Sequence, residues 1–306
     1  MPPLKAFHAS DVVDNLMSNE CRARLIGADI AIQGMSIDSR AIEKGCLFVC
    51  KGVSFKPQFL SMALASGASA YMCEKSAEEA LAHVAPDAPH IVVEDIRRAM
   101  ALAAAFVYDH PDRALHVIGI TGTKGKSTTA YMLRSILDAA DMPSSILGSI
   151  ETDDGLVRHE SHNTTPEAPD LWRHLNNTEQ SGRKVMVMEV SSHGLKYERV
   201  LGLHFETACF LNIGRDHISP VEHSDFEDYF SSKLKIFDQC STAVVNIDSD
   251  HKDRIFDAAR KAQRIVTFSA EQSDADYTAR NISLSARGTS FELVAEGETR
   301  RIDLGI

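Results

Sequence analysis

The 306-residue sequence predicts an α/β protein of two domains, a small one over residues 1–112 and a larger one over residues 113–306. Three observations support this prediction. Between residues 116 and 269, near-continuous apolar runs alternate with helical segments, which is typical of a mostly parallel sheet covered on both faces. Shorter runs alternate in the same way before residue 112. After residue 277, polar and apolar residues alternate between turn signals, which indicates a terminal antiparallel hairpin or meander.

The first domain should contain strands within residues 47–52, 70–75 and 90–95. A helix over 57–68 ends on glycine, and a second helix runs from Ile96 and stops at Pro111. The stretch 110–114 is therefore the expected domain boundary.

The second domain alternates strands and helices along the chain. Strands are expected at 116–121, 184–190, 206–213, 242–248 and 264–269, and helices at 127–140, 225–239 and 250–262. In sheets of this kind, ligands bind at the carboxyl ends of the strands, so functional residues are expected there.

Composition excludes several classes of protein. The net charge is −11, from 32 basic and 43 acidic residues, which argues against general nucleic-acid binding. No apolar run approaches the roughly 18 residues that a membrane helix needs, and the N-terminus has no apolar signal segment. We therefore expect a cytoplasmic protein, without membrane contact and monomeric. The six cysteines show neither Cys-x-x-Cys nor zinc-ligand spacing, so they are interpreted as reduced thiols that pack as small hydrophobic residues.

The segment Gly119–Thr128 has the features of a phosphate-binding loop. An apolar strand precedes it and an amphipathic helix follows, as such a loop requires. Glycines let backbone N–H groups close around phosphate oxygens at the start of a helix. Lys126 can neutralise the β- and γ-phosphates, and the Ser127 hydroxyl can ligate Mg²⁺. The glycines at 119, 122 and 125 do not have the spacing of the general P-loop, and the alternative is a glycine-rich turn without a ligand.

The loop resembles the ATP loop of the Mur ligase superfamily, which includes muramyl peptide ligases, folylpolyglutamate synthases and cyanophycin synthetase. The resemblance covers residues from about 35 to 306 and is nearest to the MurE branch, the UDP-N-acetylmuramyl-tripeptide synthetases. It implies a UDP-sugar-binding domain over 1–112 and a central ATP-binding domain over 113–306. The ATP-binding residues that it implies are Gly122, Thr123, Lys124, Gly125, Lys126, Ser127 and Thr128.

Three further segments resemble the family's substrate-binding elements. They are Ile37–Arg40, Asn163–Glu167 and Glu189–Gly194 followed by Arg199. The substrate-binding residues that they imply are Ser39, Arg40, Asn163, Thr164, Thr165, Ser191 and Arg199. The simpler interpretations are a turn with an Asp–Arg pair for the first segment and a helix start at Thr165-Pro166 for the second. The sequence departs from the family pattern at two places, which are the loop that follows Gly52 and the residue Tyr197.

Two strand-end residues resemble the family's metal ligands. Glu189 ends an apolar strand, where a carboxylate is costly unless it has a partner such as Mg²⁺. Its simpler interpretation is a helix cap. His217 lies in an Asn-x-x-x-Asp-His element whose histidine, by the resemblance, ligates a second Mg²⁺ and takes part in catalysis. His159, His162 and His223 lack such context and are interpreted as surface residues.

Lys233 lies in the middle of an apolar helical stripe. The stripe consists of Phe226, Tyr229, Phe230, Phe237 and Cys240. A buried lysine tends to lose its proton, and a neutral amine can react with CO₂. The pattern Tyr229-Lys233-Phe237 resembles a family motif in which the lysine is carbamylated and helps to bind metal. Lys126, His217 and carbamylated Lys233 are thus the implied catalytic residues, with Ser127, Glu189, His217 and Lys233 as metal ligands. A lysine that reaches solvent from the helix edge is the alternative.

The resemblance implies ATP-dependent amide formation. ATP would phosphorylate the terminal carboxylate of UDP-MurNAc-L-Ala-D-Glu, and an amino acid would attack the acyl phosphate. The family's C-terminal domain, which selects that amino acid, is absent from the sequence, so we expect a truncated form that binds substrate but turns over poorly. The alternatives are another amide ligase of the superfamily, of the cyanophycin or folylpolyglutamate type, or a non-catalytic nucleotide-binding module.

Overall fold

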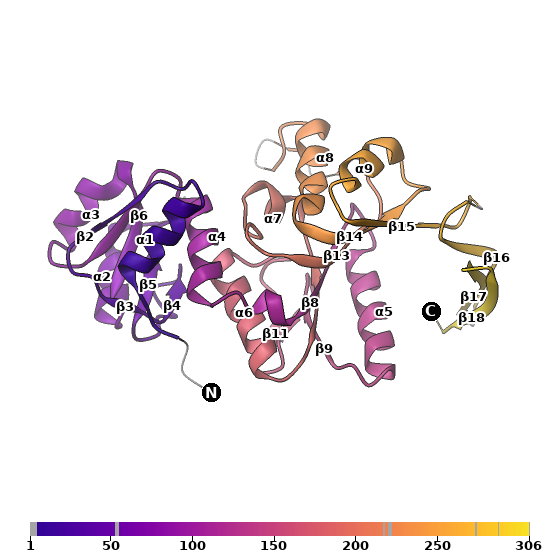
Figure 1. Ribbon diagram of the computed structural model, residues 1–306, viewed down its shortest axis with the longest axis horizontal. Helices are drawn as coiled ribbons and strands as arrows, with labels where there is room; N and C mark the ends of the chain where they lie inside the picture. Colours follow the sequence, from indigo (N-terminus) through magenta and orange to yellow (C-terminus); the bar gives the residue numbers. More distant parts are fainter. Residues whose placement is uncertain are drawn as a thin grey trace.

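The computed structural model describes residues 5–52, 55–216, 218–219, 222–272, 274–286 and 288–305. These residues form a five-stranded sheet near the N-terminus, a two-stranded ribbon beside it and an eleven-stranded sheet in the rest of the chain. Figure 1 shows the two larger sheets side by side, with the end of the eleven-stranded sheet projecting beyond its helices. The α/β class predicted from the sequence is confirmed, including the terminal antiparallel strands.

The five-stranded sheet has the strand order β2-β7-β6-β5-β4, in which β2 alone is antiparallel to its neighbour. Its strands are β2 (Ala23–Ile26), β4 (Gly34–Ser36), β5 (Cys46–Val49), β6 (Ala70–Glu74) and β7 (His90–Val93). The ribbon pairs β1 (Phe7–His8) with β3 (Ala31–Ile32). All residues of β5 and β7 are buried, which explains their unbroken apolar sequence.

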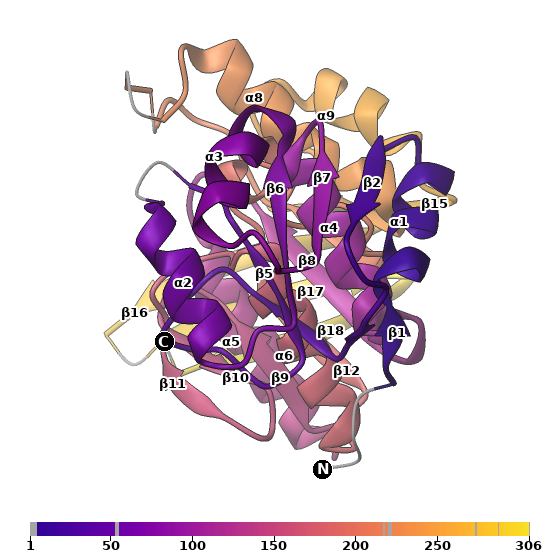
Figure 2. The same cartoon turned by 90° about the vertical axis from the view of Figure 1, so that its left-hand side faces the viewer.

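Helices cover both faces of this sheet. They are α1 (Ala9–Ser18), α2 (Pro57–Ala65), α3 (Glu78–Val84) and α4 (Ile96–Val107). Figure 2 looks onto this end, with α2 and α3 on one side of the sheet and α1 on the other. The sequence predicted α2 and α4 but not α1 and α3. Asp95 begins α4, since its carboxylate accepts the N–H groups of Arg97 and Arg98.

The larger sheet has the order β11-β10-β9-β12-β8-β13-β14-β15-β16-β17-β18. Its strands are β8 (His116–Thr121), β9 (Ser144–Leu147), β10 (Glu151–Asp153), β11 (Arg158–Glu160), β12 (Val185–Glu189), β13 (Phe205–Phe210), β14 (Cys240–Asn246), β15 (Arg264–Ser269), β16 (Tyr277–Ser285), β17 (Gly288–Ala295) and β18 (Glu298–Leu304). Strands from β9 through β16 in this order run parallel, whereas β10–β11 and β16–β17–β18 are antiparallel.

The helices of this part are α5 (Lys126–Ala139), α6 (Ala168–Gln180), α7 (Ser192–Lys196), α8 (Phe226–Leu234) and α9 (Lys252–Ala259). The predicted helix over 225–239 is α8 followed by a 3₁₀ helix, Lys235–Gln239. The sequence did not predict β9, β10 and β11. These strands are short, and β11 is exposed along its whole length, so no hydrophobic alternation marks it.

The two larger sheets meet through α4 and α6, which pack against each other (Figure 1). Buried residues of α1, α4, α6 and the second sheet form one continuous hydrophobic cluster. The chain passes from one sheet to the other through the 3₁₀ helix Pro111–Ala114, where the boundary was expected. The division into domains at 112/113 stays a prediction.

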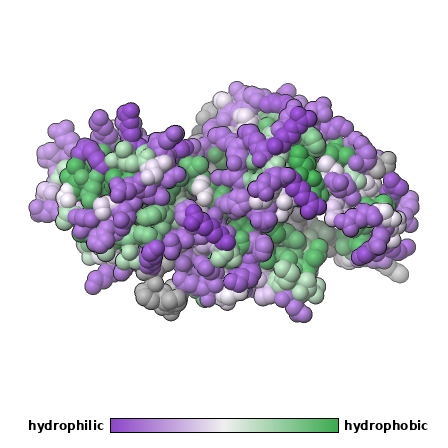
Figure 3. Space-filling view, viewed as in Figure 1, coloured by the Kyte–Doolittle hydropathy of each residue, from purple (hydrophilic) through white to green (hydrophobic). Residues whose placement is uncertain are grey.

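Hydrophilic residues predominate on the face shown in Figure 3, with smaller apolar areas between them. Among the residues that the structure describes, no helix is long and apolar enough to cross a membrane. All six cysteines are free thiols, five of them buried, as the sequence interpretation required.

Candidate active site

The glycine-rich loop, Glu189 and Asn212 lie at the ends of three neighbouring parallel strands. In the sheet, β8 lies between β12 and β13, with Ile120 opposite Glu189 and Thr121 opposite Phe210. The carboxyl ends of these strands therefore meet at one edge of the sheet. The glycine-rich loop follows β8, Glu189 ends β12, and Asn212 follows β13.

The loop has the backbone that a phosphate cradle needs. Gly122 has φ +154° and Gly125 has φ +86°, conformations that L side chains rarely adopt. A Cβ atom at Gly122 would also lie 3.0 Å from Cβ of Leu211. Gly125 is the N-cap of α5, which begins at Lys126. The first N–H groups of α5 therefore face the loop without intrahelical partners, which favours an anion there.

Asn212 fixes the loop from the neighbouring strand. Its Oδ1 accepts the backbone N–H groups of Thr123 at 3.1 Å and Lys124 at 3.0 Å, and its Nδ2 donates to the Lys124 carbonyl at 3.1 Å. The sequence marked Asn212 only as part of a motif, and its role in holding the loop was missed. An asparagine directly after an apolar strand, beside a glycine-rich loop, is the signal that could have indicated it.

Two lysine side chains converge on one carbonyl oxygen of the loop. Nζ of Lys126 donates to the Gly122 carbonyl at 3.0 Å, and Nζ of Lys233 donates to the same oxygen at 2.9 Å. Lys233 is 2% exposed, which confirms the predicted burial. Burial, and then the charge of Lys126, lower the pKa of Lys233 to about 7, although Asp216 opposes this. A large fraction of Lys233 is therefore a neutral amine at physiological pH.

Glu189 faces the start of α5 and is 1% exposed. Its Oε2 accepts a hydrogen bond from Ser127 Oγ at 3.0 Å, and its Oε1 accepts one from the Ser149 N–H at 2.9 Å. A Cβ atom at Gly148 would lie 2.4 Å from Glu189 Oε1, so only glycine leaves room for the carboxylate. A carboxylate beside a hydroxyl is a set of oxygen ligands that suits Mg²⁺. Glu189 does not cap a helix, since Ser191 caps α7.

His217, predicted as a metal ligand and catalytic residue, lies outside the described residues. Its neighbour Asp216 accepts a hydrogen bond from Lys124 Nζ at 2.8 Å. Within the described ranges, no group of three or more His, Cys, Asp or Glu residues has the arrangement of a metal site.

The predicted substrate residues Thr165, Ser191 and Arg199 lie together beside the end of β12. Thr165 Oγ1 lies 3.0 Å from the Glu189 carbonyl and accepts the Ser191 N–H at 2.9 Å. Arg199 donates to the Thr165 carbonyl and forms an ion pair of 2.9 Å with Glu167. The alternative in which Thr165 caps a helix is wrong, because α6 begins at Ala168 and its N-cap residue is Glu167, whose side chain forms no capping hydrogen bond.

Glu167 also pairs with Lys51, which follows β5 of the first sheet. Both side chains are largely buried, and burial lowers the pKa of Lys51 despite the attraction of Glu167. This ion pair joins the first sheet to the segment that contains Thr165. Sequence reasoning missed both residues.

Of the remaining predicted substrate residues, Thr164 lies nearest to Glu189. Thr164 Oγ1 is 2.9 Å from Ser149 Oγ, which in turn contacts Glu189. Asn163 and Ile37 both line a cavity of about 540 Å³. Ser39 is buried, and Arg40 is exposed and paired with Asp38 at 2.7 Å, which is the turn that the simpler interpretation describes.

His223 is not a surface residue, contrary to the sequence interpretation. It is fully buried, with Nε2 2.9 Å from Ser192 Oγ and Nδ1 3.3 Å from the Asp228 carboxylate. Its ring also stacks on His193, with centroids 5.0 Å apart. The polar partners on α7 and α8 explain why a histidine is accommodated there. His159 and His162 are exposed, as interpreted.

The fold and the geometry define a class: a phosphate-loop α/β protein with an acidic strand end beside the loop and a buried lysine over it. Residues 120–306 match the family model described as the Mur ligase middle domain. The chain belongs to the Mur ligase family.

Curated relatives agree with this assignment. Over 275 residues the chain is 38% identical to the UDP-N-acetylmuramyl-tripeptide synthetase of Bifidobacterium longum, covering 89% of this chain and 52% of that protein. It is 34% identical over 280 residues to a 2,6-diaminopimelate ligase of Clostridium acetobutylicum, which covers 91% of this chain and 56% of that protein. It is 38% identical over 222 residues to the L-lysine ligase of Streptococcus pneumoniae, covering 72% and 45%. Both ligases are named for UDP-N-acetylmuramoyl-L-alanyl-D-glutamate. The chain spans about half the length of these relatives.

Solved structures have the same fold. A UDP-N-acetylmuramoyl-L-alanyl-D-glutamate–2,6-diaminopimelate ligase matches with a TM-score of 0.73 at 26% identity, covering 90% of this chain and 56% of that one. MurF from Acinetobacter baumannii matches with a TM-score of 0.67 at 22% identity, covering 99% and 62%, which shows a shared fold.

Proposed function

We propose that this protein is part of an ATP-dependent ligase that adds an amino acid to UDP-MurNAc-L-Ala-D-Glu through an acyl phosphate. The observation that supports this most is the position of the Thr165–Ser191–Arg199 group directly beside the Glu189 strand end and the phosphate loop. A bound carboxylate there would lie close to the γ-phosphate of a nucleotide held by the loop. The curated relatives named above are ligases of this kind.

In this proposal the loop holds the nucleotide triphosphate. The backbone N–H groups of Lys126, Ser127 and Thr128 at the start of α5 would surround phosphate oxygens, and Lys126 would turn from the Gly122 carbonyl toward the negative charge. The chain's contribution to the reaction is mainly positioning and charge neutralisation. Burial lowers the pKa of Lys126, so its charge gains the most when a phosphate is its partner.

The same site would hold Mg²⁺. Ser127 Oγ and Glu189 are the described residues with fitting oxygen atoms, and the space that Gly148 leaves keeps Glu189 in place. When bound, the ion would neutralise phosphate charge. His217 stays a predicted ligand.

Lys233 is proposed to carry a carbamate. Its neutral Nζ would attack the carbon of CO₂ and release one proton, which leaves an anionic N-carboxylate on the side chain. The lowered pKa supports this step, because only the neutral amine has the required lone pair. The carbamate would place a negative charge near Lys126 and a bound metal ion.

The nucleotide-sugar end is proposed to lie in the cavity lined by Ile37 and Asn163, and Ser39 and Arg40, in the segment that follows Ile37, stay predicted substrate residues. The relatives are named for two different incoming amino acids, lysine and 2,6-diaminopimelate, so their names leave the amino acid open. A cytoplasmic, monomeric protein stays the expectation.

Calorimetric titration of the 306-residue chain with UDP-MurNAc-L-Ala-D-Glu tests the proposed substrate. The wild type should bind it, and Arg199→Ala should weaken binding at least tenfold, because Arg199 holds the Thr165 segment and faces the ligand. Arg260→Ala, which changes an exposed arginine at the C-terminal end of α9, is the matched control. Binding of Mg·ATP without binding of the UDP-sugar peptide would favour a ligase of the cyanophycin or folylpolyglutamate type. Normal cell-wall synthesis in cells whose gene carries Lys126→Ala would favour a non-catalytic nucleotide-binding module.

A further inference from the structure

A short helix, α7, contacts both the candidate substrate residues and helix α8 (Figure 1). On one side, the Ser191 N–H donates to Thr165 Oγ1 at 2.9 Å, and a Cβ atom at Gly194 would lie 2.8 Å from Thr165 Cγ2. On the other side, Lys196 Nζ lies 2.6 Å from the Asp228 carboxylate on α8. Helix α7 is therefore held against the Thr165 segment and against α8 at the same time.

The side chain of His223 lies in the contact between α7 and α8. Its Nε2 is 2.9 Å from Ser192 Oγ, at the start of α7, and its ring stacks on His193 with the centroids 5.0 Å apart. From α8, the ring of Tyr229 meets it edge-on, with the centroids 5.2 Å apart. His223 and Tyr229 are 0% exposed and Ser192 is 5% exposed. Because buried side chains are close-packed, a displacement of one of them must be accommodated by the others.

Tyr229 extends this contact to the glycine-rich loop. Its hydroxyl lies 3.1 Å from Oγ1 of Thr123, a loop residue that is 8% exposed. One turn further along α8, Nζ of Lys233 donates to the Gly122 carbonyl of the same loop at 2.9 Å. A continuous series of buried contacts therefore runs from the loop through Tyr229 and His223 to α7.

We propose that His223 is a positioning residue that couples the two ligands of the site. A nucleotide triphosphate held by the glycine-rich loop would strengthen binding of the UDP-sugar peptide beside α7. This inference rests on the proposed function, in which the loop holds ATP and the Thr165–Ser191–Arg199 group holds the end of the peptide. His223 touches neither ligand in this proposal, so it acts on the coupling between the two sites and not on either site alone.

Preorganisation gives this coupling its sign. A nucleotide that fixes the loop fixes Thr123, and the contact of Thr123 with the Tyr229 hydroxyl then fixes His223 and the start of α7. The UDP-sugar peptide binds to a helix that is already in position, so it loses less free energy to ordering. By thermodynamic reciprocity, the peptide strengthens nucleotide binding by the same factor.

The coupling factor of the 306-residue chain tests the proposal. It is the Kd of UDP-MurNAc-L-Ala-D-Glu without nucleotide divided by its Kd in saturating Mg·AMPPNP, both measured by calorimetric titration. The wild type should give a factor of about five or more. Tyr229→Phe removes the hydroxyl that contacts Thr123, and Ser192→Ala removes the one that contacts His223. Each should lower the factor below about two, while the Kd of either ligand alone changes less than about threefold. His223→Leu, which removes the imidazole itself, should lower the factor in the same way.

Two further variants separate coupling from a general loss of stability. The double variant Tyr229→Phe/Ser192→Ala should lower the factor no further than either single variant, because both substitutions interrupt the same series of contacts. Tyr71→Phe is the matched control: it removes the hydroxyl of another fully buried tyrosine, on β6 of the first sheet, and should retain the wild-type factor.

The outcomes distinguish this inference from the proposed function. Equal Kd values with and without Mg·AMPPNP in the wild type would overturn it, and so would a factor that stays at the wild-type value in Tyr229→Phe and Ser192→Ala. In both cases the two ligands still bind, so the proposed function is retained. A wild-type chain that binds no UDP-sugar peptide removes the proposed function and this inference together.

Discussion

At the scale of single residues, Lys233 shows most clearly how the sequence determines chemistry. An apolar helical stripe requires its side chain to be buried, and burial beside Lys126 lowers its pKa to about 7. Burial of the charged amine costs free energy, and the hydrogen bond that Lys233 donates to the Gly122 carbonyl offsets only part of that cost. A residue kept at such a cost in stability is commonly functional.

Replacement of Lys233 gives a prediction about stability and pH. The pKa of Lys233 is about 7 in the folded chain and near its ordinary value of 10.5 in the unfolded chain. Between these values the unfolded chain binds more protons, so stability rises with pH across pH 7 to 10.5. Lys233→Met should therefore be more stable than wild type at pH 7, by up to about 4 kcal/mol, and this difference should shrink toward pH 10.

Urea unfolding in CO₂-free buffer at pH 7 and pH 10 measures this difference. Lys235→Met, an exposed lysine two residues further on, is the control and should show no such change with pH. A Lys233→Met variant that is less stable than wild type at pH 7 would contradict the assigned burial cost.

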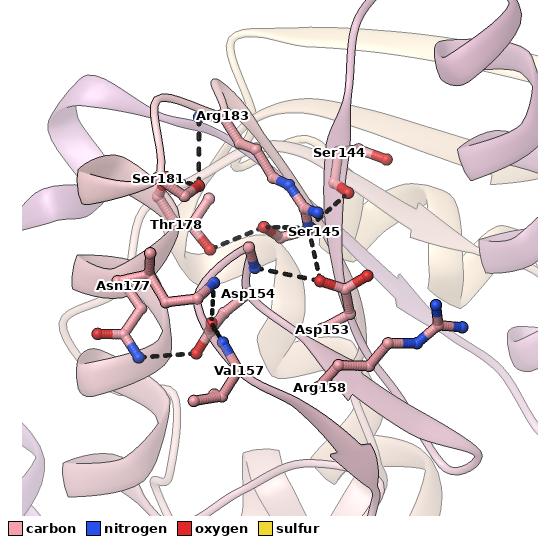
Figure 4. Close-up of polar contacts among 12 residues, drawn as sticks. Ser144, Ser145, Asp153, Asp154, Val157, Arg158, Asn177, Thr178, Ser181 and Arg183 are labelled. Atoms are coloured by element: carbon pink, nitrogen blue, oxygen red, sulfur yellow. Dashed lines mark hydrogen bonds and ion pairs between the residues drawn. The ribbon is translucent and has the colours of Figure 1, made fainter.

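At the scale of elements, the sequence predicted the parts of the fold that have strong hydrophobic patterns. The parallel strands β8, β12 and β15 follow near-continuous apolar runs and were predicted within a residue or two. The hairpin β10–β11 was not predicted, because polar contacts hold it: Asp153 pairs with Arg134 and Arg183, and Asp154 pairs with α6. Figure 4 shows the two aspartates pointing apart. Polar networks of this kind leave no periodic signal in the sequence.

Residues of the candidate site could be predicted only where they interrupt a strong local pattern in the sequence. Lys126 follows a glycine-rich loop at a helix start, Glu189 ends an apolar strand, and Lys233 lies on an apolar helix face. A charged residue is conspicuous in the sequence at each of these places. Ser149 and Lys51 contact the site from elements that are distant in sequence, so local pattern reasoning could not find them.

The turn after β9 gives a prediction at this scale. Gly148→Ala would place a methyl group 2.4 Å from Glu189 Oε1, so the carboxylate must move away from Ser127. We expect a loss of stability of about 1–3 kcal/mol and Mg²⁺-dependent ATP binding that is weaker by about tenfold. Gly34→Ala, where the nearest atom would lie at 3.7 Å, is the matched control. Unchanged Mg²⁺ dependence of nucleotide binding in Gly148→Ala would argue against Glu189 as a metal ligand.

At the scale of the whole molecule, two sheets contribute to one site. The packing of α4 on α6 and the Lys51–Glu167 ion pair hold the first sheet against the segment that contains Thr165 (Figure 1). The proposed nucleotide-sugar cavity is lined from both parts, by Ile37 and by Asn163. In the proposed function, one ligand would therefore contact residues of both sheets, while the glycine-rich loop is formed by the second sheet alone.

The central claim is that the loop after β8 binds a magnesium-complexed nucleotide triphosphate beside the UDP-sugar peptide. The most direct test is calorimetric titration with Mg·AMPPNP, a non-hydrolysable ATP analogue, in the presence of UDP-MurNAc-L-Ala-D-Glu. The wild type should bind the analogue, and Lys126→Ala should lose at least tenfold in affinity while its affinity for the UDP-sugar peptide is retained. Lys184→Ala, at the opposite end of β12, should bind both ligands as the wild type does. Equal binding of Mg·AMPPNP by wild type and Lys126→Ala would contradict the account.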